Sequence, residues 1–137
     1  MTVDRKEKWT VRELKPGDIL RVDTGRYYHF GIYIGDETVI HFAGPDPHTL
    51  TDASMAAVRN DSLQHFAMGK SLEVRDYSLA EKLRKKPPKK VIEAAESQLG
   101  QGGYDIIYNN CEHFVNKCAF GIAWSTQIDE MRSALDK

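Results

Sequence analysis

The alternation of hydrophobic and polar positions predicts a small antiparallel sheet in the N-terminal part of the chain. Residues 29–34 alternate between apolar side chains and polar or small ones, which is typical of a half-buried strand. A Gly-Asp-Glu turn at 35–37 leads into a second apolar run at 38–42, and a shorter run at 19–22 predicts a third strand. We therefore expect strands joined by tight turns.

A helical period marks two later segments. Pro88 can occupy the first turn of a helix that carries apolar residues at every third or fourth position and stops at Gly100. A second helix begins near Cys111 and continues its apolar stripe to Ile122. Together with the strands, these helices predict an α+β fold in which an antiparallel sheet packs on helices.

Other segments carry weaker signals. Residues 1–13 are charged and lack periodicity, so we expect a flexible lead-in followed by a single domain over 14–137. The alternation in 71–75 favours a second hairpin with 63–67. The basic, proline-containing stretch 82–90 indicates a surface loop.

Composition narrows the classes of protein that fit. The chain has 19 Lys and Arg against 20 Asp and Glu, so it lacks the overall positive field expected of a nucleic-acid binder. Its two cysteines lie seven residues apart in one predicted helix, about 10 Å along the axis, which is too far for a disulfide. No apolar run approaches the ~20 residues of a membrane span. We expect a monomer in a reducing, cytoplasmic compartment.

The first hairpin places two histidines close together. If the turn comprises 35–37, the numbers of facing residues sum to 72, and His41 lies opposite Gly31. His29 shares a side of the strand with Gly31, so the two imidazoles would be diagonal neighbours on one face, with open space beside the glycine. A two-residue turn would instead put His41 on the opposite face.

The start of the second helix carries a candidate nucleophile. Asn110 is a good N-cap, which puts Cys111 in the first turn, where the helix dipole favours a thiolate. We assign Cys111 as nucleophile, His29 as general base and then acid, and His41 as the group that orients His29. The Cys111 N–H would stabilise an oxyanion, with a second donor from Tyr27.

Plainer interpretations of these residues stay open. A buried cysteine is usually an inert part of the core, and histidines on a strand are usually structural. Zinc could bind two histidines and a cysteine, but the other histidines lack ligand spacing, so we expect no metal and no cofactor. His113 is interpreted as structural, and Cys118 as part of the core.

These motifs resemble those of the lecithin retinol acyltransferase-like family, and within it the small phospholipase A/acyltransferase branch. The resemblance runs from the Leu-Lys-Pro-Gly-Asp turn at 14–18, through the two-histidine hairpin at 29–41, to the Asn-Cys-Glu-His-Phe-Val-Asn box at 110–116. It implies that 14–137 is one catalytic domain with a circularly permuted papain-like, NlpC-type fold. The order His29, His41, Cys111 agrees with that permutation.

The resemblance also implies a chemistry. Cys111 would attack an ester of a glycerophospholipid to give an acyl-cysteine thioester and a lysophospholipid, and water or the amine of phosphatidylethanolamine would then accept the acyl group. The protein would be peripheral to membranes, with Lys85, Lys86, Lys89 and Lys90 attracted to anionic headgroups. Relatives of that branch often end in a hydrophobic anchor, whereas 125–137 are polar, so we expect that an anchor was removed or that this chain works without one.

Two other classes of function compete with the acyltransferase. A permuted papain-like thiol isopeptidase or peptidase also pairs an early histidine with an Asn-Cys box, although Glu112 favours the acyltransferase box. A non-catalytic interaction module on the same fold is the other alternative. All three candidate catalytic residues are present, which allows catalysis without proving it.

Overall fold

The computed structural model describes residues 7–48, 52–105 and 109–135. Within them the chain folds into one antiparallel sheet with strand order β1-β6-β2-β3-β4-β5. The strands are β1 Lys8–Thr10, β2 Ile19–Asp23, β3 Tyr28–Gly35, β4 Thr38–Ala43, β5 Ala57–Ser62 and β6 Leu72–Asp76. The helices are η1 Ala53–Met55, α1 Leu63–Ala67, α2 Leu79–Arg84, α3 Pro88–Ser97, α4 Cys111–Phe120 and α5 Thr126–Leu135. The predicted α+β class is thereby confirmed.

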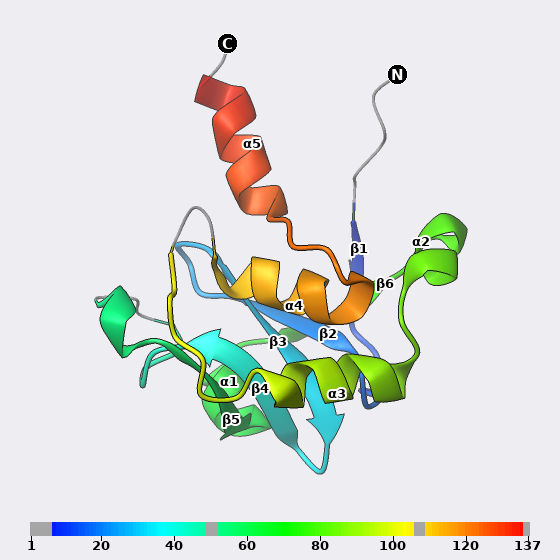
Figure 1. The fold of residues 1–137 in the computed structure, drawn as a ribbon, viewed down its shortest axis with the longest axis horizontal. Coiled ribbons are helices and arrows are strands. Elements are labelled where there is room, and N and C mark those ends of the chain that lie inside the picture. Colours follow the sequence, from blue (N-terminus) through cyan, green and yellow to red (C-terminus); the bar gives the residue numbers. More distant parts are fainter. Residues whose placement is uncertain (1–6, 49–51, 106–108, 136–137) are drawn as a thin grey trace.

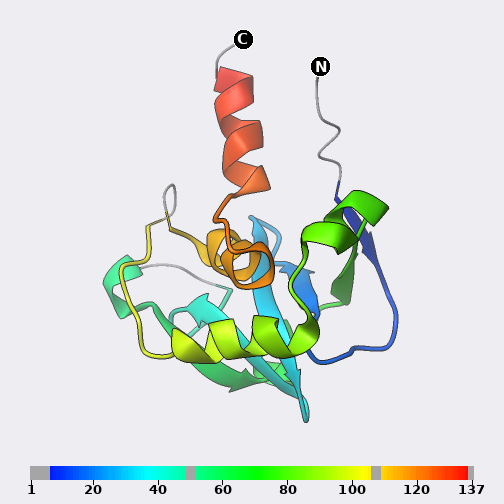
Figure 2. The same ribbon diagram turned by 45° about the vertical axis from the view of Figure 1, so that its right-hand side comes forward.

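Helices cover the two faces of the sheet unequally. α3 and α4 lie side by side over one face, while the short α1 lies on the other (Figure 1). The larger core, on the α3 and α4 side, joins Phe30, Ile32 and Phe42 to apolar residues of these helices. The smaller core surrounds Phe66 of α1. α5 projects from the body beyond α4 (Figures 1 and 2).

The boundaries of α4 follow from local sequence. The side chain of Asn110 accepts hydrogen bonds from the N–H groups of Glu112 and His113, and the His113 ring in turn bonds the N–H of Asn110. Gly121 ends the helix in the left-handed conformation, with φ of 79°. The predicted start at Cys111 is therefore confirmed, whereas Ile122 lies beyond the helix and is exposed.

The β3–β4 hairpin reaches the predicted register by a different turn. Ile32 pairs with Ile40, so facing numbers sum to 72 as expected. However, Gly35 pairs with Thr38, and the turn has only two residues, 36–37, both with positive φ. A bulge between Tyr33 and Gly35 inserts one extra residue into β3. This extra residue compensates for the shorter turn, so the register beyond the bulge is the predicted one. His41 therefore stays on the face of His29 despite the two-residue turn.

Three expectations for the rest of the chain are wrong in part. Residues 8–10 pair with β6 as an edge strand and are not part of a flexible lead-in, while 1–6 lie outside the described residues. Residues 63–67 form a helix, not a strand, because Ser62 caps it and Met68 ends it with a left-handed φ. The strand at 72–76 pairs instead with β2 and β1.

The basic stretch is also more structured than expected. α2 starts at a capping box of Ser78 and Glu81, and α3 starts at Pro88, so only 85–87 connect the two helices. The prediction of a surface loop over 82–90 is wrong. The capping residues before α2 and the proline at the start of α3 favour helices, although the stretch is basic and contains prolines.

Candidate active site

Two buried imidazoles and a carboxylate form a hydrogen-bonded chain across three neighbouring strands. Nε2 of His29 on β3 lies 2.8 Å from Nδ1 of His41 on β4. Nε2 of His41 lies 2.6 Å from Oδ2 of Asp61 on β5. Both imidazoles are buried, and Asp61 is partly exposed at the end of the chain. The structure thus brings the two predicted histidines together and adds an acid that the sequence analysis missed.

The space beside Gly31 is filled, contrary to our expectation that it is open. A Cβ atom on Gly31 would lie 2.5 Å from Cγ1 of Val39 and 2.8 Å from the ring of Phe66. The Phe66 ring centroid lies 5.2 Å from that of His29 and 5.5 Å from that of His41. Gly31 therefore admits an aromatic side chain that packs on both imidazoles and restricts their rotation.

Cys111 lies at the start of α4, against the strand that carries His29. Its side chain is buried, and Sγ is 4.0 Å from the carbonyl oxygen of Tyr28. The backbone of Phe30 also lies close enough to lower the pKa of the thiol. The thiol therefore lies along β3 beside the residues that flank His29 on either side.

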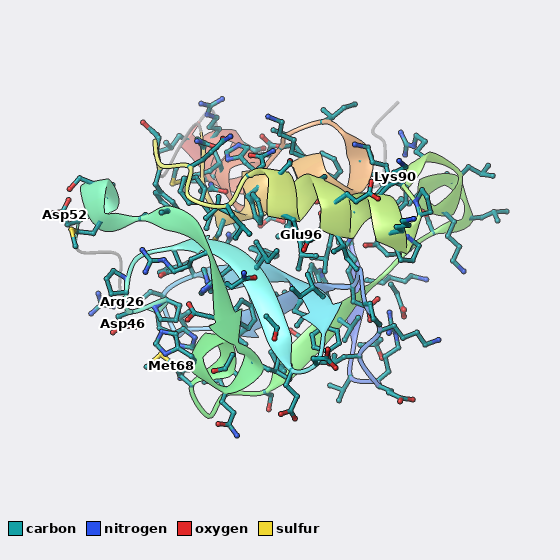
Figure 3. All side chains as sticks on the ribbon, turned by 60° about the horizontal axis from the view of Figure 1, so that its bottom comes forward. Arg26, Asp46, Asp52, Met68, Lys90 and Glu96 are labelled. Carbon is teal, nitrogen blue, oxygen red and sulfur yellow. The ribbon has the colours of Figure 1, made fainter. Side chains whose placement is uncertain are left out.

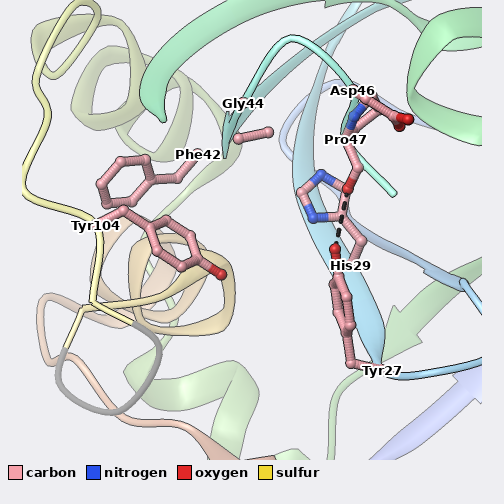
Figure 4. Close-up of a pocket in the computed structure, with 8 residues that line it drawn as sticks. Tyr27, His29, Phe42, Gly44, Asp46, Pro47 and Tyr104 are labelled. Atoms are coloured by element: carbon pink, nitrogen blue, oxygen red, sulfur yellow. Dashed lines mark hydrogen bonds between the residues drawn. The ribbon is translucent and has the colours of Figure 1, made fainter. Parts of the chain in front are cut away.

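A small pocket opens where β3 and β4 separate. The β3–β4 ladder runs from Thr38 to the pair Ile32–Ile40. Beyond it, His29 of β3 and 42–44 on the side of β4 line the pocket, together with Tyr104 (Figure 4). Tyr104 also lies close enough to Cys111 for its side chain to lower the pKa of the thiol. Tyr104 thus connects the cysteine to the pocket that His29 lines.

Burial sets the protonation states of both candidate catalytic groups. It raises the pKa of the Cys111 thiol to about 11, although Tyr104 and nearby backbone N–H groups favour the thiolate. This overturns our expectation that the helix start lowers the thiol pKa, because the cost of desolvating a charge exceeds the helix-dipole effect. Burial, and then the neighbouring His41 and His48, hold the pKa of His29 well below its ordinary value. At rest the site therefore holds a neutral thiol and a neutral imidazole.

The two tyrosines of the pocket differ in what their hydroxyls do. The hydroxyl of Tyr27 donates to the carbonyl of Pro47 at 3.3 Å, the contact drawn in Figure 4, and its N–H donates to Thr24. Both donors of Tyr27 are therefore engaged with the protein. Tyr104, in contrast, lies beside the candidate nucleophile, because its side chain lowers the pKa of the Cys111 thiol. The sequence analysis missed it, since a lone tyrosine in a glycine-rich loop carries no motif.

A buried polar network joins α5 to the start of α4 and to β3. Glu112 accepts a hydrogen bond from the hydroxyl of Ser125 at 2.7 Å and one from the N–H of Gln127. The side chain of Gln127 accepts from the N–H of Tyr28 at 2.9 Å. Burial raises the pKa of Glu112, which these donors partly offset. Because Tyr28 precedes His29, this network holds the strand and helix that carry the two reactive groups.

His113 and Cys118 have the structural roles that the sequence predicted. His113 completes the capping box of α4, so its structural interpretation is confirmed. Cys118 is fully buried in the larger core, as predicted. Over the part of the chain that the structure describes, no three His, Cys, Asp or Glu residues are grouped to hold a metal ion.

The proposed membrane-facing lysines lie away from the pocket. Lys90 projects from α3 at one end of the molecule, whereas Asp46 beside the pocket lies at the other end (Figure 3). Lys90 also pairs with Glu93 at 3.3 Å, and the ammonium of Lys85 lies 5.0 Å from the ring centroid of Tyr77. Among the residues placed by the structure, no helix is long and apolar enough to span a bilayer.

A family model and individual known proteins both match this chain and belong to one family. A family profile described as lecithin retinol acyltransferase matches residues 12–124. Lecithin retinol acyltransferase of Rattus norvegicus is 30% identical over 152 residues, covering 96% of this chain and 65% of that protein. The Homo sapiens protein of that name is 33% identical, with coverage of 83% and 58%. Phospholipase A and acyltransferase 3 of Homo sapiens is 33% identical over 132 residues, covering 88% of this chain and 80% of that protein. This chain thus spans less than two thirds of the lecithin retinol acyltransferases it matches.

Proposed function

Because the chain belongs to the lecithin retinol acyltransferase family, we propose that it is a thiol-dependent phospholipase A/acyltransferase. It removes an acyl chain from a glycerophospholipid through an acyl-cysteine thioester and passes it to water or to the amine of phosphatidylethanolamine. The observation that carries the proposal is a buried thiol at a helix start, packed against the strand of a hydrogen-bonded histidine pair. The proposed triad is Cys111, His29 and His41.

The geometry supports the following acylation step. Nδ1 of His29 takes the thiol proton as Sγ of Cys111 attacks the ester carbonyl carbon. The N–H of Cys111 and the hydroxyl of Tyr104 stabilise the oxyanion. As the bond to the glycerol oxygen breaks, His29 returns the proton to that oxygen, which releases a lysophospholipid. Water or an amine then attacks the thioester, with His29 again as base.

The proposal extends to the fold family. The sheet, the helix that begins at the cysteine, and the order of histidines before cysteine fit a circularly permuted papain-like, NlpC-type arrangement. The pocket is a small, open hollow, well below the roughly 300 Å³ at which drug-sized ligand pockets begin.

The acyl intermediate is tested by intact-protein mass spectrometry after incubation with phosphatidylcholine vesicles. We expect a mass increase of one fatty-acyl group that peptide mapping assigns to Cys111 and that hydroxylamine removes. No adduct, together with labelling of Cys111 by an electrophilic ubiquitin-like probe, would favour an isopeptidase instead. Reaction with neither reagent would favour a non-catalytic interaction module.

We further propose that α2 and the adjoining basic residues attach the protein to the membrane surface, at the end of the molecule away from the pocket (Figure 3). Leu79 and Leu83 lie one turn apart on α2 and are 79% and 83% exposed. Exposed Lys82 and Arg84 flank them, and Lys89 continues the positive surface. Apolar side chains among cations suit an interface with anionic lipid. Of the lysines proposed from the sequence, Lys89 and Lys90 are exposed, and Lys85 and Lys86 are partly buried.

Leu83→Ser is expected to weaken binding to phosphatidylserine-containing vesicles about tenfold, since one leucine no longer enters the lipid. Co-sedimentation measures the bound fraction. The control is Met55→Ser, which removes a residue that is 56% exposed on η1, near Asp52 at the opposite end of the molecule (Figure 3). If Met55→Ser weakens binding and Leu83→Ser does not, the membrane contacts the pocket end instead.

A further inference from the structure

Asp61 extends the histidine pair by one ionised group. In the β4–β5 ladder Asp61 lies opposite Val39, and Arg59 lies opposite His41, so all four share one face of the sheet. His41 reaches diagonally to Asp61, with 2.6 Å between Nε2 and Oδ2. The hydrogen bond is short, which is typical of a charge-assisted contact.

The direction of the hydrogen bonds follows from the chemistry of the carboxylate. An ionised carboxylate only accepts, so Nε2 of His41 must carry the hydrogen. Nδ1 of a neutral His41 is then an acceptor, and Nε2 of His29 must donate to it. In a neutral His29 this leaves Nδ1 unprotonated. Among the described residues that atom makes no hydrogen bond, so it is unprotonated and unpaired, as the proposed base must be.

The charges around the chain agree with these protonation states. The hydrogen bond from His41 lowers the pKa of Asp61, and His65 and Arg59 act in the same direction. Burial lowers the pKa of His41 despite the favourable contact with Asp61. His65 lies 4.0 Å from Asp61, and the ring centroid of His48 lies 6.3 Å from that of His29. Asp61 is therefore ionised while both buried imidazoles are neutral.

We propose that Asp61 is a positioning residue of the active site: it selects, through His41, the tautomer of His29 whose Nδ1 can accept the thiol proton. The inference rests on the proposed function. It adds Asp61 to the proposed triad, so that the active site becomes a chain of four groups. Asp61 does not touch substrate. Once His29 has taken the proton, the carboxylate two hydrogen bonds away also stabilises the positive charge that forms inside the protein.

Asp61→Asn tests the inference with little change of shape. The amide can donate to Nε2 of His41, which reverses both hydrogen bonds and places a hydrogen on Nδ1 of His29. We expect kcat for acyl transfer to fall about 10- to 100-fold, with KM nearly unchanged. In serine proteases the wrong histidine tautomer lowers kcat ~10⁴-fold. The loss here is smaller because the introduced amide can also turn its oxygen towards His41 and keep the original tautomer. Asn60→Ala, an exposed neighbour on the other face of β5, is the matched control and should keep full activity.

Two readouts separate positioning from a merely structural role. In protein labelled with ¹⁵N at histidine, the Nδ1 signal of His29 should be of the unprotonated type in the wild type and should shift towards the protonated type in Asp61→Asn. The rate at which iodoacetamide alkylates Cys111 at pH 7 should fall in the same variant by a similar factor to kcat. Thermal unfolding of both variants verifies that the fold is kept.

The outcomes for Asp61 and for the proposed function are distinguishable. If the wild type forms no acyl adduct, the proposed function fails, yet the histidine signals and the alkylation rate still report on Asp61. If Asp61→Asn folds, keeps the wild-type rate of alkylation and leaves the Nδ1 signal of His29 unchanged, the inference is overturned even when acyl transfer is observed.

Discussion

Cys111→Ser is expected to abolish acyl transfer, lowering the rate by about 10⁴-fold or more, while the protein remains folded. The thiol is the attacking atom, and a hydroxyl at the same place has a far higher pKa than the about 11 of this buried thiol. A neutral His29 could not activate it to the same extent. Release of fatty acid from phosphatidylcholine vesicles measures the rate, and the acyl adduct should disappear from the mass spectrum.

Cys118→Ser is the matched control for this change. Cys118 is as deeply buried as Cys111 and lies on the same helix, but it packs in the core. Its replacement should cost stability, on the order of 1–3 kcal/mol for a buried hydroxyl with an incomplete set of partners, and leave turnover per folded molecule unchanged. Near wild-type turnover by Cys111→Ser, or loss of turnover in Cys118→Ser alone, would contradict the assigned nucleophile.

His29→Gln should lower kcat about 10³-fold, and His41→Gln about 10- to 100-fold, because the base contributes more than the group that orients it. Glutamine keeps most of the volume at each site, so the buried Phe66 retains its neighbours. The measurement is kcat on the same vesicles, with thermal unfolding as the control for folding. Equal losses, or a larger loss in His41→Gln, would reverse the roles of the two histidines.

The pH dependence of the wild type provides a second measure of His29. Its pKa is held well below 6.5, so the imidazole stays neutral as the pH falls through that value. Activity should therefore persist from pH 8 to pH 6 and decline only as the pH falls through the lowered pKa of the folded protein. A decline centred near pH 6.5 would indicate an imidazole with ordinary solvation, in conflict with the buried site.

Local signals predicted the parts of the site that depend on neighbouring residues in the chain. The Asn-Cys sequence predicts a capped helix start, and the structure shows that helix beginning at Cys111. An assumed three-residue turn predicts that His29 and His41 share a face, and the structure shows the same register. The turn between them was predicted wrongly, because a two-residue turn and a bulge give the same register as a three-residue turn.

Residues that reach the site from distant segments were not predictable in the same way. Asp61 lies in β5, a segment without clear periodicity, and Phe66 lies in a helix that the alternation nearby suggested was a strand. Tyr104 belongs to a loop that meets Cys111 only after α3 and α4 have packed on the sheet. Such contacts depend on the order in which the elements pack in space, which secondary-structure propensities and the local hydrophobic pattern do not predict.

The helix start that carries the thiol and the family were therefore evident from the amino-acid sequence, because each depends on hydrogen bonds or motifs within a few residues. The shared face of the two histidines also needed a bulge before Gly35 that no local pattern indicated. The protonation states and the remaining partners of the site depend on how the whole chain packs. Burial, which raises the pKa of Cys111 and lowers that of His29, comes from the packing of the whole domain. The approach of Asp61 to His41 comes from the pairing of β4 with β5, which places the carboxylate beside a histidine twenty residues away in the chain.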